Sequence, residues 1–101
     1  MPKFTIDHQS KHNPEEAYEK IKEFLENDQD IRRFDPKLQC SFNDGSKKAS
    51  MKGSQFKADM EVLSSGDGCK VSVTVDLPLM LTPFKGKVQD TLQRKLTKYL
   101  G

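Results

Sequence analysis

The side chains that most often carry chemistry are few in this sequence. Its histidines are His8 and His12, and its cysteines are Cys40 and Cys69. The four-residue spacing of the histidines would suit a metal ion only if both lay on one helix, whereas His8 falls in an alternating stretch and His12 in a turn. The cysteines lie far apart without a CxxC pair, which favours reduced thiols used as small apolar side chains over a disulfide. We therefore assign no metal ligand.

Catalysis has little support in the sequence. A covalent catalyst needs a nucleophile, a base and an orienting group, and no local set supplies them. Acidic residues of the first predicted helix lie on its solvent side, where solubility alone accounts for them: Glu15, Glu19, Glu23 and Glu26. No glycine pattern precedes a helix as a phosphate-binding loop would. We expect a protein that is not an enzyme and holds no cofactor.

The segment LPLMLTPFKGKV, residues 77–88, is the most informative stretch. Strand alternation breaks within it, so Met80 would point away from the core if the strand continued. Lys85 and Lys87 stand near a helix start, where the dipole disfavours cations by a few tenths of a kcal/mol. Gly86 would be explained by a close backbone approach to the sheet or to a ligand. The candidate surface for a ligand or partner comprises Leu79, Met80, Leu81, Phe84, Lys85, Gly86, Lys87, Arg94 and Lys98.

Charge separates the two long predicted helices. Lys87, Arg94 and Lys98 form a basic stripe on the last helix, whereas the first helix is rich in glutamate. Two explanations remain open. The helices lie side by side with complementary charges, or the stripe meets an anionic partner outside the chain.

Length and composition suit one small domain over residues 1–101, with 34% apolar and 32% charged residues and no tryptophan. A net charge of +2 does not favour specific nucleic-acid binding. No run is long enough to span a membrane, and residues 1–10 lack the layout of a secretory signal, so we expect a cytoplasmic protein.

Hydrophobic periodicity outlines the elements. A strand over Lys3–His8 precedes a helix over Pro14–Asp28, with Asn13 as its N-cap. Residues 27–37 suggest a loop in which Ile31 and Phe34 contact the core.

Strands follow over residues 38–42 and, more weakly, 46–52. Residues 56–62, beginning with Phe56, and 69–77 form a hairpin with one wet face. Thr82 and Pro83 should cap a last helix that ends at Gly101. The order predicts an α+β fold, with an antiparallel sheet of four to five strands and both helices on one face.

One motif resembles a known family. An apolar pair, Thr-Pro, a bulky apolar residue, Lys-Gly and a basic helix occur here at Leu79, Leu81, Thr82, Pro83, Phe84, Lys85, Gly86 and Lys87. This motif resembles the C-terminal segment of the small polyhydroxyalkanoic acid system proteins, which are bacterial and associated with polyester-granule genes. The layout is similar over the whole chain, but residues 27–56 depart with a longer polar insertion. The resemblance implies a reduced helix-grip, START-like fold and brings no catalytic residues.

Two hypotheses of function follow. The first is a non-enzymatic binding protein of the polyhydroxyalkanoate granule system that contacts a hydrophobic surface or groove through residues 77–84 and the last helix. The second is a carrier of a small apolar ligand, with a cavity between the last helix and the sheet. The oligomeric state stays open, a homodimer included.

Overall fold

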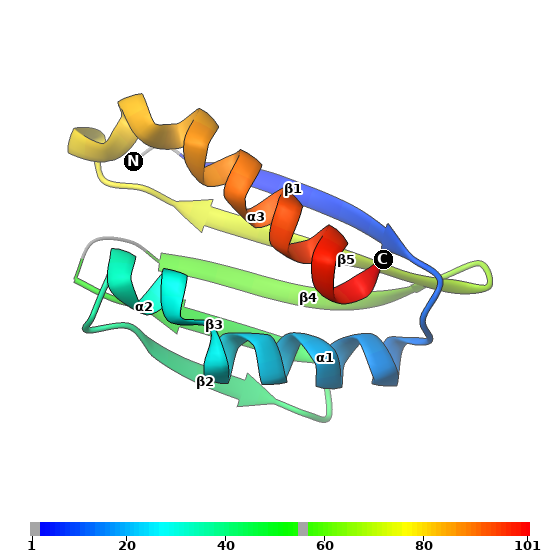
Figure 1. Ribbon diagram of the computed structural model, residues 1–101. Coiled ribbons are helices and arrows are strands. Elements are labelled where there is room, and N and C mark those ends of the chain that lie inside the picture. The colour runs from blue at the N-terminus through cyan, green and yellow to red at the C-terminus, as the bar shows by residue number, and fades with distance from the viewer. Residues whose placement is uncertain (1–2, 55–56) are drawn as a thin grey trace.

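The computed structural model describes residues 3–54 and 57–101 (Figure 1). The elements run in the order β1 (Lys3–Ser10), α1 (Pro14–Asn27), α2 (Gln29–Phe34), β2 (Gln39–Asn43), β3 (Lys48–Lys52), β4 (Lys57–Ser65), β5 (Gly68–Asp76), the 3-10 helix η1 (Leu79–Phe84) and α3 (Lys85–Leu100). Phe56, assigned above to a strand, lies outside the described residues.

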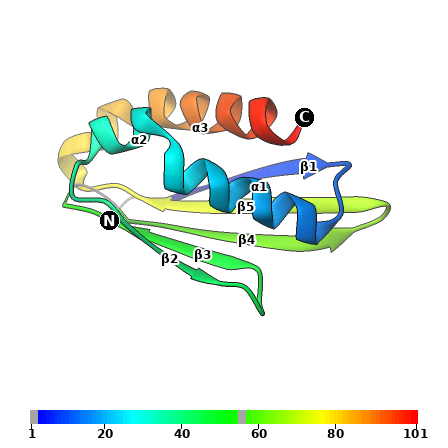
Figure 2. The ribbon, with the colours of Figure 1, turned by 60° about the horizontal axis from the view of Figure 1, so that its bottom comes forward.

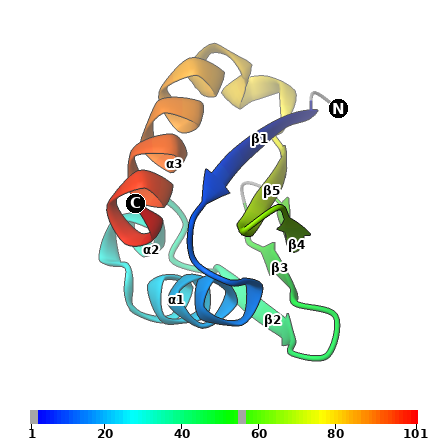
Figure 3. The same cartoon turned by 90° about the vertical axis from the view of Figure 1, so that its right-hand side faces the viewer.

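Five antiparallel strands form one sheet in the order β1-β5-β4-β3-β2. Both long helices, α1 and α3, lie on the same face of this sheet (Figure 2). Viewed from its end, the sheet curls around the two helices (Figure 3). The predicted α+β layout is therefore confirmed, including both helices on one face.

Strand register produces a continuous apolar inner face. Val75 on β5 lies opposite Phe4 on β1 and Ala58 on β4, and Ala58 in turn faces Met51 on β3. Directly opposed residues of antiparallel strands project to the same face of the sheet. Ile21 of α1 covers this face and is only 1% exposed. The weak strand predicted over 46–52 is confirmed as β3. Its inward-facing residues, Ala49 and Met51, lie opposite Met60 and Ala58 of β4.

The predicted loop over residues 27–37 is wrong, because residues 29–34 form the helix α2. Asp28 caps it: one carboxylate oxygen, Oδ1, accepts from the amides of Asp30 at 2.9 Å and Ile31 at 3.1 Å. The guanidinium of Arg32 donates to the Leu25 carbonyl at 2.8 Å. This bond gives a partner to one of the last carbonyls of α1, which have none within the helix. A single residue, Asp28, thus joins two helices.

The predicted Thr82-Pro83 cap is also wrong. Thr82 and Pro83 lie inside η1, and α3 begins two residues later at Lys85 without a side-chain cap. Backbone carbonyls take over the capping role: Pro78 accepts from Leu81 at 2.9 Å, and Thr82 accepts from Lys85. The tighter 3-10 turn therefore runs directly into α3.

Candidate functional site

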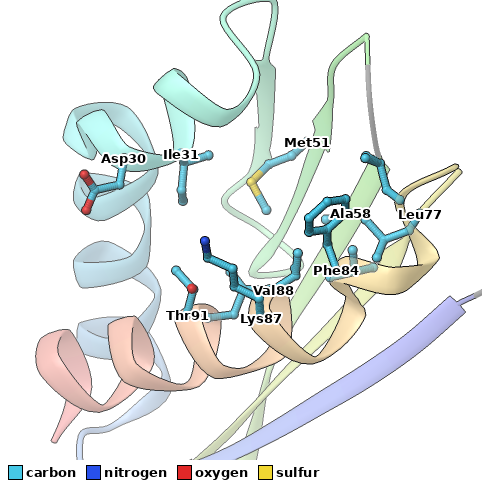
Figure 4. Close-up of a pocket in the computed structure, with 12 residues that line it drawn as sticks. Asp30, Ile31, Met51, Ala58, Leu77, Phe84, Lys87, Val88 and Thr91 are labelled. Atoms are coloured by element: carbon cyan, nitrogen blue, oxygen red, sulfur yellow. The ribbon is translucent and has the colours of Figure 1, made fainter.

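An apolar cavity of about 430 Å³ lies between α3, α2 and the inner face of the sheet (Figure 4). Met51, Ala58 and Val75 line it from three neighbouring strands. Val88 and Leu92 line it from α3, where a four-residue spacing brings both side chains to one side of the helix. The cavity therefore separates the last helix from the sheet at this end of the fold.

The 3-10 helix η1 forms one end of the cavity and also an exposed apolar surface. Leu81 and Phe84 line the cavity, whereas Leu79 and Met80 do not. Leu79 is 75% exposed, Met80 is 86% exposed and Phe84 is 51% exposed. We call Leu79, Met80 and Phe84 the apolar tip. Within the described residues, Leu63 on β4 is the other large apolar side chain that is exposed.

Among the described residues that line the cavity, three side chains carry functional groups: Asp30, Lys87 and Thr91. Lys87 and Thr91 are one turn apart on α3, and Asp30 belongs to α2. Figure 4 shows the Lys87 ammonium extending away from α3 into the space below α2, while the Asp30 carboxylate points away from that space. The cavity is thus apolar with a polar border between the two helices.

Lys95 holds that border together. Its Nζ lies 2.7 Å from Asp30 Oδ2 and 2.9 Å from Asp28 Oδ2. The hydrogen bond from Lys95 keeps the pKa of the Asp30 carboxyl below its ordinary value, and the hydrogen bonds to Asp30 and Asp28 raise the pKa of Lys95. Both residues therefore keep their charges at neutral pH.

The remaining residues of the candidate surface do not gather at the cavity. Lys85 lies with its Nζ 5.8 Å from the Phe4 ring centre, and Lys98 lies 5.4 Å from that of Tyr99. Arg94 donates to the Asp90 carbonyl of its own helix at 3.4 Å. Gly86 has no protein atom within 4 Å of a Cβ built on it, so the expected close approach to the sheet is wrong, while an approach to a ligand stays a prediction. The structure thus brings Leu81, Phe84 and Lys87 together and separates the others.

The two long helices contact each other, but not through the glutamates of α1 and the basic stripe of α3. Phe24 and Tyr99 join α1 to α3 with ring centres 4.9 Å apart. The ion pairs that reach α3 come from Asp28 and Asp30, and their partner is Lys95. Within the described residues, the basic stripe of Lys87, Arg94 and Lys98 makes no ion pair with α1.

The histidines and cysteines occupy separate structural positions. His8 Nε2 lies 3.0 Å from the Gly101 carbonyl, and its Nδ1 lies 3.1 Å from the amide nitrogen of Gln93, whereas His12 pairs with Glu16 at 3.2 Å. Both thiols are free, and burial raises the pKa of Cys40 and of Cys69. Raised thiol pKa values oppose a nucleophilic role. In the part of the chain that the structure describes, no three potential ligands gather around a metal position.

Sequence reasoning missed Asp30, Thr91 and most of the cavity wall. Asp28 before Ile31 was an available signal, because an aspartate two or three residues ahead of an apolar position is a helix N-cap pattern. Thr91 lies between Val88 and Leu92 on the inner side of α3. No helix among residues 3–54 and 57–101 has the length and apolar character needed to cross a membrane.

Comparison with protein families gives a match over nearly the whole chain. The family described as "Putative polyhydroxyalkanoic acid system protein" matches residues 4–100. No curated protein sequence matches the chain.

Solved structures with similar folds share little sequence. TTHA0849 from Thermus thermophilus has a TM-score of 0.63 at 13% identity, covering 98% of this chain and 94% of that one. Ara h 8.0201 has a TM-score of 0.57 at 10% identity, covering 98% and 97%. CV1439 from Chromobacterium violaceum has a TM-score of 0.56 at 8% identity, covering 99% and 95%. These neighbours establish a helix-grip fold.

Proposed function

Because the chain belongs to the polyhydroxyalkanoic acid system protein family, we propose that it is a non-enzymatic binding protein that contacts the hydrophobic surface of polyester granules. The observation that carries this proposal is the apolar tip, in which Leu79 and Met80 are 75% and 86% exposed. Leu79 and Met80 are consecutive in the chain, and exposed apolar side chains that group together are typical of a contact surface.

The energy available from the tip is sufficient for a weak to moderate contact. Full burial of a leucine, methionine or phenylalanine side chain contributes about 1.5–3 kcal/mol, and each 1.4 kcal/mol changes affinity about tenfold. Phe84 already lies partly against the cavity, so Leu79 and Met80 would supply most of the newly buried area. An uncharged polyester offers no ions to pair with the basic stripe, so salt should weaken this contact little.

The described lining of the cavity supports a binding role rather than a catalytic one. Asp30 is paired with Lys95, which leaves the Lys87 ammonium and the Thr91 hydroxyl as the other functional groups among the lining residues that the structure describes. A nucleophile needs an adjacent base, and Asp30 is the one carboxylate or imidazole side chain in the described lining. We place this binding protein in the cytoplasm, where the free thiols of Cys40 and Cys69 would stay reduced.

Co-sedimentation with purified polyester granules tests the proposal. Wild-type protein should pellet with granules and with apolar beads, and it should remain bound when salt is raised. If the protein stays in the supernatant at all granule concentrations, the tip is not a granule-binding surface. Release by salt would indicate that the basic stripe, rather than the tip, makes the contact.

A second candidate, carriage of a small apolar ligand, is favoured by the cavity itself. Its volume of about 430 Å³ falls within the range of about 300–1,000 Å³ that is usual for small-molecule sites. A ligand that binds only the native state raises the melting temperature by mass action. A panel of lipids and hydroxyacyl compounds should therefore contain members that raise it, and the absence of any shift would refute this candidate.

A further inference from the structure

Positive charges exceed negative charges at the cavity border, and this excess favours an anionic ligand. Asp28 and Asp30 supply two negative charges, and Lys95 and Arg33 pair with them at distances up to 3.9 Å. These four charges cancel. Lys87, which lines the cavity, then adds an uncompensated positive charge, because the ion pairs among residues 3–54 and 57–101 do not include it.

The surroundings of Lys87 would support a hydrogen-bonded anion. Its ammonium reaches into the cavity mouth from α3 (Figure 4). Thr91 is four residues further along, so its hydroxyl lies on the same side of the helix. An ammonium and a hydroxyl can both donate to one carboxylate, and bonds to a charged group are roughly twice as strong as neutral ones.

We infer that the cavity takes an acyl chain with a free carboxylate head, with the carboxylate at Lys87 and Thr91 and the apolar chain along Met51, Ala58 and Leu77. This inference rests on the second candidate function above and deepens it by naming the head group. Met51, Ala58 and Leu77 lie on the sheet side of the cavity and the two donors lie on α3, which favours one orientation of the ligand. A hydroxyalkanoic acid, the monomer of the polymer in the family's description, carries such a head group.

The experiment compares decanoic acid with its methyl ester, which keeps the chain but removes the charge. Calorimetric titrations are run below the aggregation concentration of each probe. Wild-type protein should bind the acid about tenfold or more tightly than the ester, as a hydrogen-bonded charge predicts. Lys87→Met should lower affinity for the acid to that for the ester and leave the ester's affinity unchanged.

Two further variants serve as a charge control and as a test of the Thr91 hydroxyl. Lys20→Met removes the same charge from the exposed side of α1, away from the cavity lining, and should leave both affinities unchanged. Thr91→Val keeps the side-chain shape and should weaken binding of the acid alone. Circular dichroism of each variant confirms that the fold is retained.

The possible failures are distinguishable. If wild-type protein binds acid and ester equally, the carboxylate inference is refuted while carriage of an apolar ligand stands. If it binds neither probe, both are refuted, and granule binding through the tip is still decided by co-sedimentation. A loss of acid binding in Lys20→Met equal to that in Lys87→Met would show a general charge effect and would overturn the assignment of Lys87.

Discussion

Lys95 on α3 lies 2.9 Å from Asp28, the residue at which α1 ends and α2 begins. The Asp28 side chain is 3% exposed, and its other oxygen caps α2. One carboxylate therefore fixes the start of α2 and ties it to the last helix. Because α2 and α3 border the cavity, this contact holds two of its walls in place.

Removing the Lys95 ammonium should destabilise the fold. Lys95→Met leaves Asp28 Oδ2 buried without its cation, which costs about 1–3 kcal/mol for an unsatisfied polar group. The free energy of unfolding, measured in urea at neutral pH, should fall by this amount. Lys20→Met is the matched control and should change it by less than about 0.5 kcal/mol. Equal effects of the two variants would show that the Asp28 contact contributes nothing specific.

Tyr18 should make the protein sensitive to alkali. Burial, reinforced by a 2.7 Å hydrogen bond to Asp44, raises the pKa of Tyr18 to about 12 from an ordinary 10.0. Between these values the unfolded state loses the proton and the folded state keeps it. The free energy of unfolding therefore falls as pH rises from about 10 to about 12, and the full contribution is present below that range.

Tyr18→Phe should flatten that alkaline decline, although the raised pKa of Lys95 preserves part of it above 10.5. Urea unfolding at a series of pH values measures the slope. An ultraviolet titration of Tyr99→Phe, which leaves Tyr18 as the sole tyrosine, measures the Tyr18 phenol directly. Ionisation near the ordinary value in that variant would contradict the buried Tyr18 environment.

Gly86 should tolerate a side chain. A Cβ at this position of α3 would meet no atom within 4 Å, and alanine favours a helix by up to about 1 kcal/mol over glycine. Gly86→Ala should therefore leave the melting temperature unchanged or raise it. Gly68→Ala provides the contrast, because its Cβ would collide with the Ser10 carbonyl oxygen. A clear destabilisation by Gly86→Ala would restore a requirement for glycine at the start of α3.

Ala58 offers a way to separate the two candidate functions. Ala58→Leu extends a side chain from β4 into the cavity, so the fold should retain its stability within about 1 kcal/mol. Small ligands that raise the melting temperature of the wild type should no longer do so. Granule co-sedimentation should be unaffected, because the exposed side chains of Leu79 and Met80 do not line the cavity. Loss of both activities would place granule contact inside the cavity.

The strands and long helices could be predicted because each has a local signal. Alternation across residues 69–77 and the Asn13 cap both depend on near neighbours, and the structure confirms that the Asn13 side chain accepts from the Glu16 amide at 2.8 Å. The helix α2 was hidden by polar composition, since its stability comes from Asp28 and from Lys95, which is distant in sequence. The local Thr82-Pro83 signal misled, because η1 uses backbone carbonyls instead.

The site was less predictable than the fold. The exposure of Met80 could be predicted, because the alternation of apolar and polar residues breaks at the end of β5. The cavity was not, because its walls come from separate segments whose packing sets the empty volume, as Ile31 and Met51 illustrate. Lys87 was chosen for its position in a basic stripe, whereas its distinguishing feature is a cavity that only the tertiary fold creates.

The affinity of Met80→Glu for polyester granules tests the central claim most directly. Dissociation constants come from co-sedimentation at increasing granule concentrations, with Leu63→Glu as a control that adds the same charge at the other exposed apolar side chain described, on β4. Because Met80 burial contributes about 1.5–3 kcal/mol, Met80→Glu should weaken binding at least about tenfold, and Leu63→Glu should leave it near the wild-type value. Equal affinity of Met80→Glu and wild type would contradict granule binding through the apolar tip.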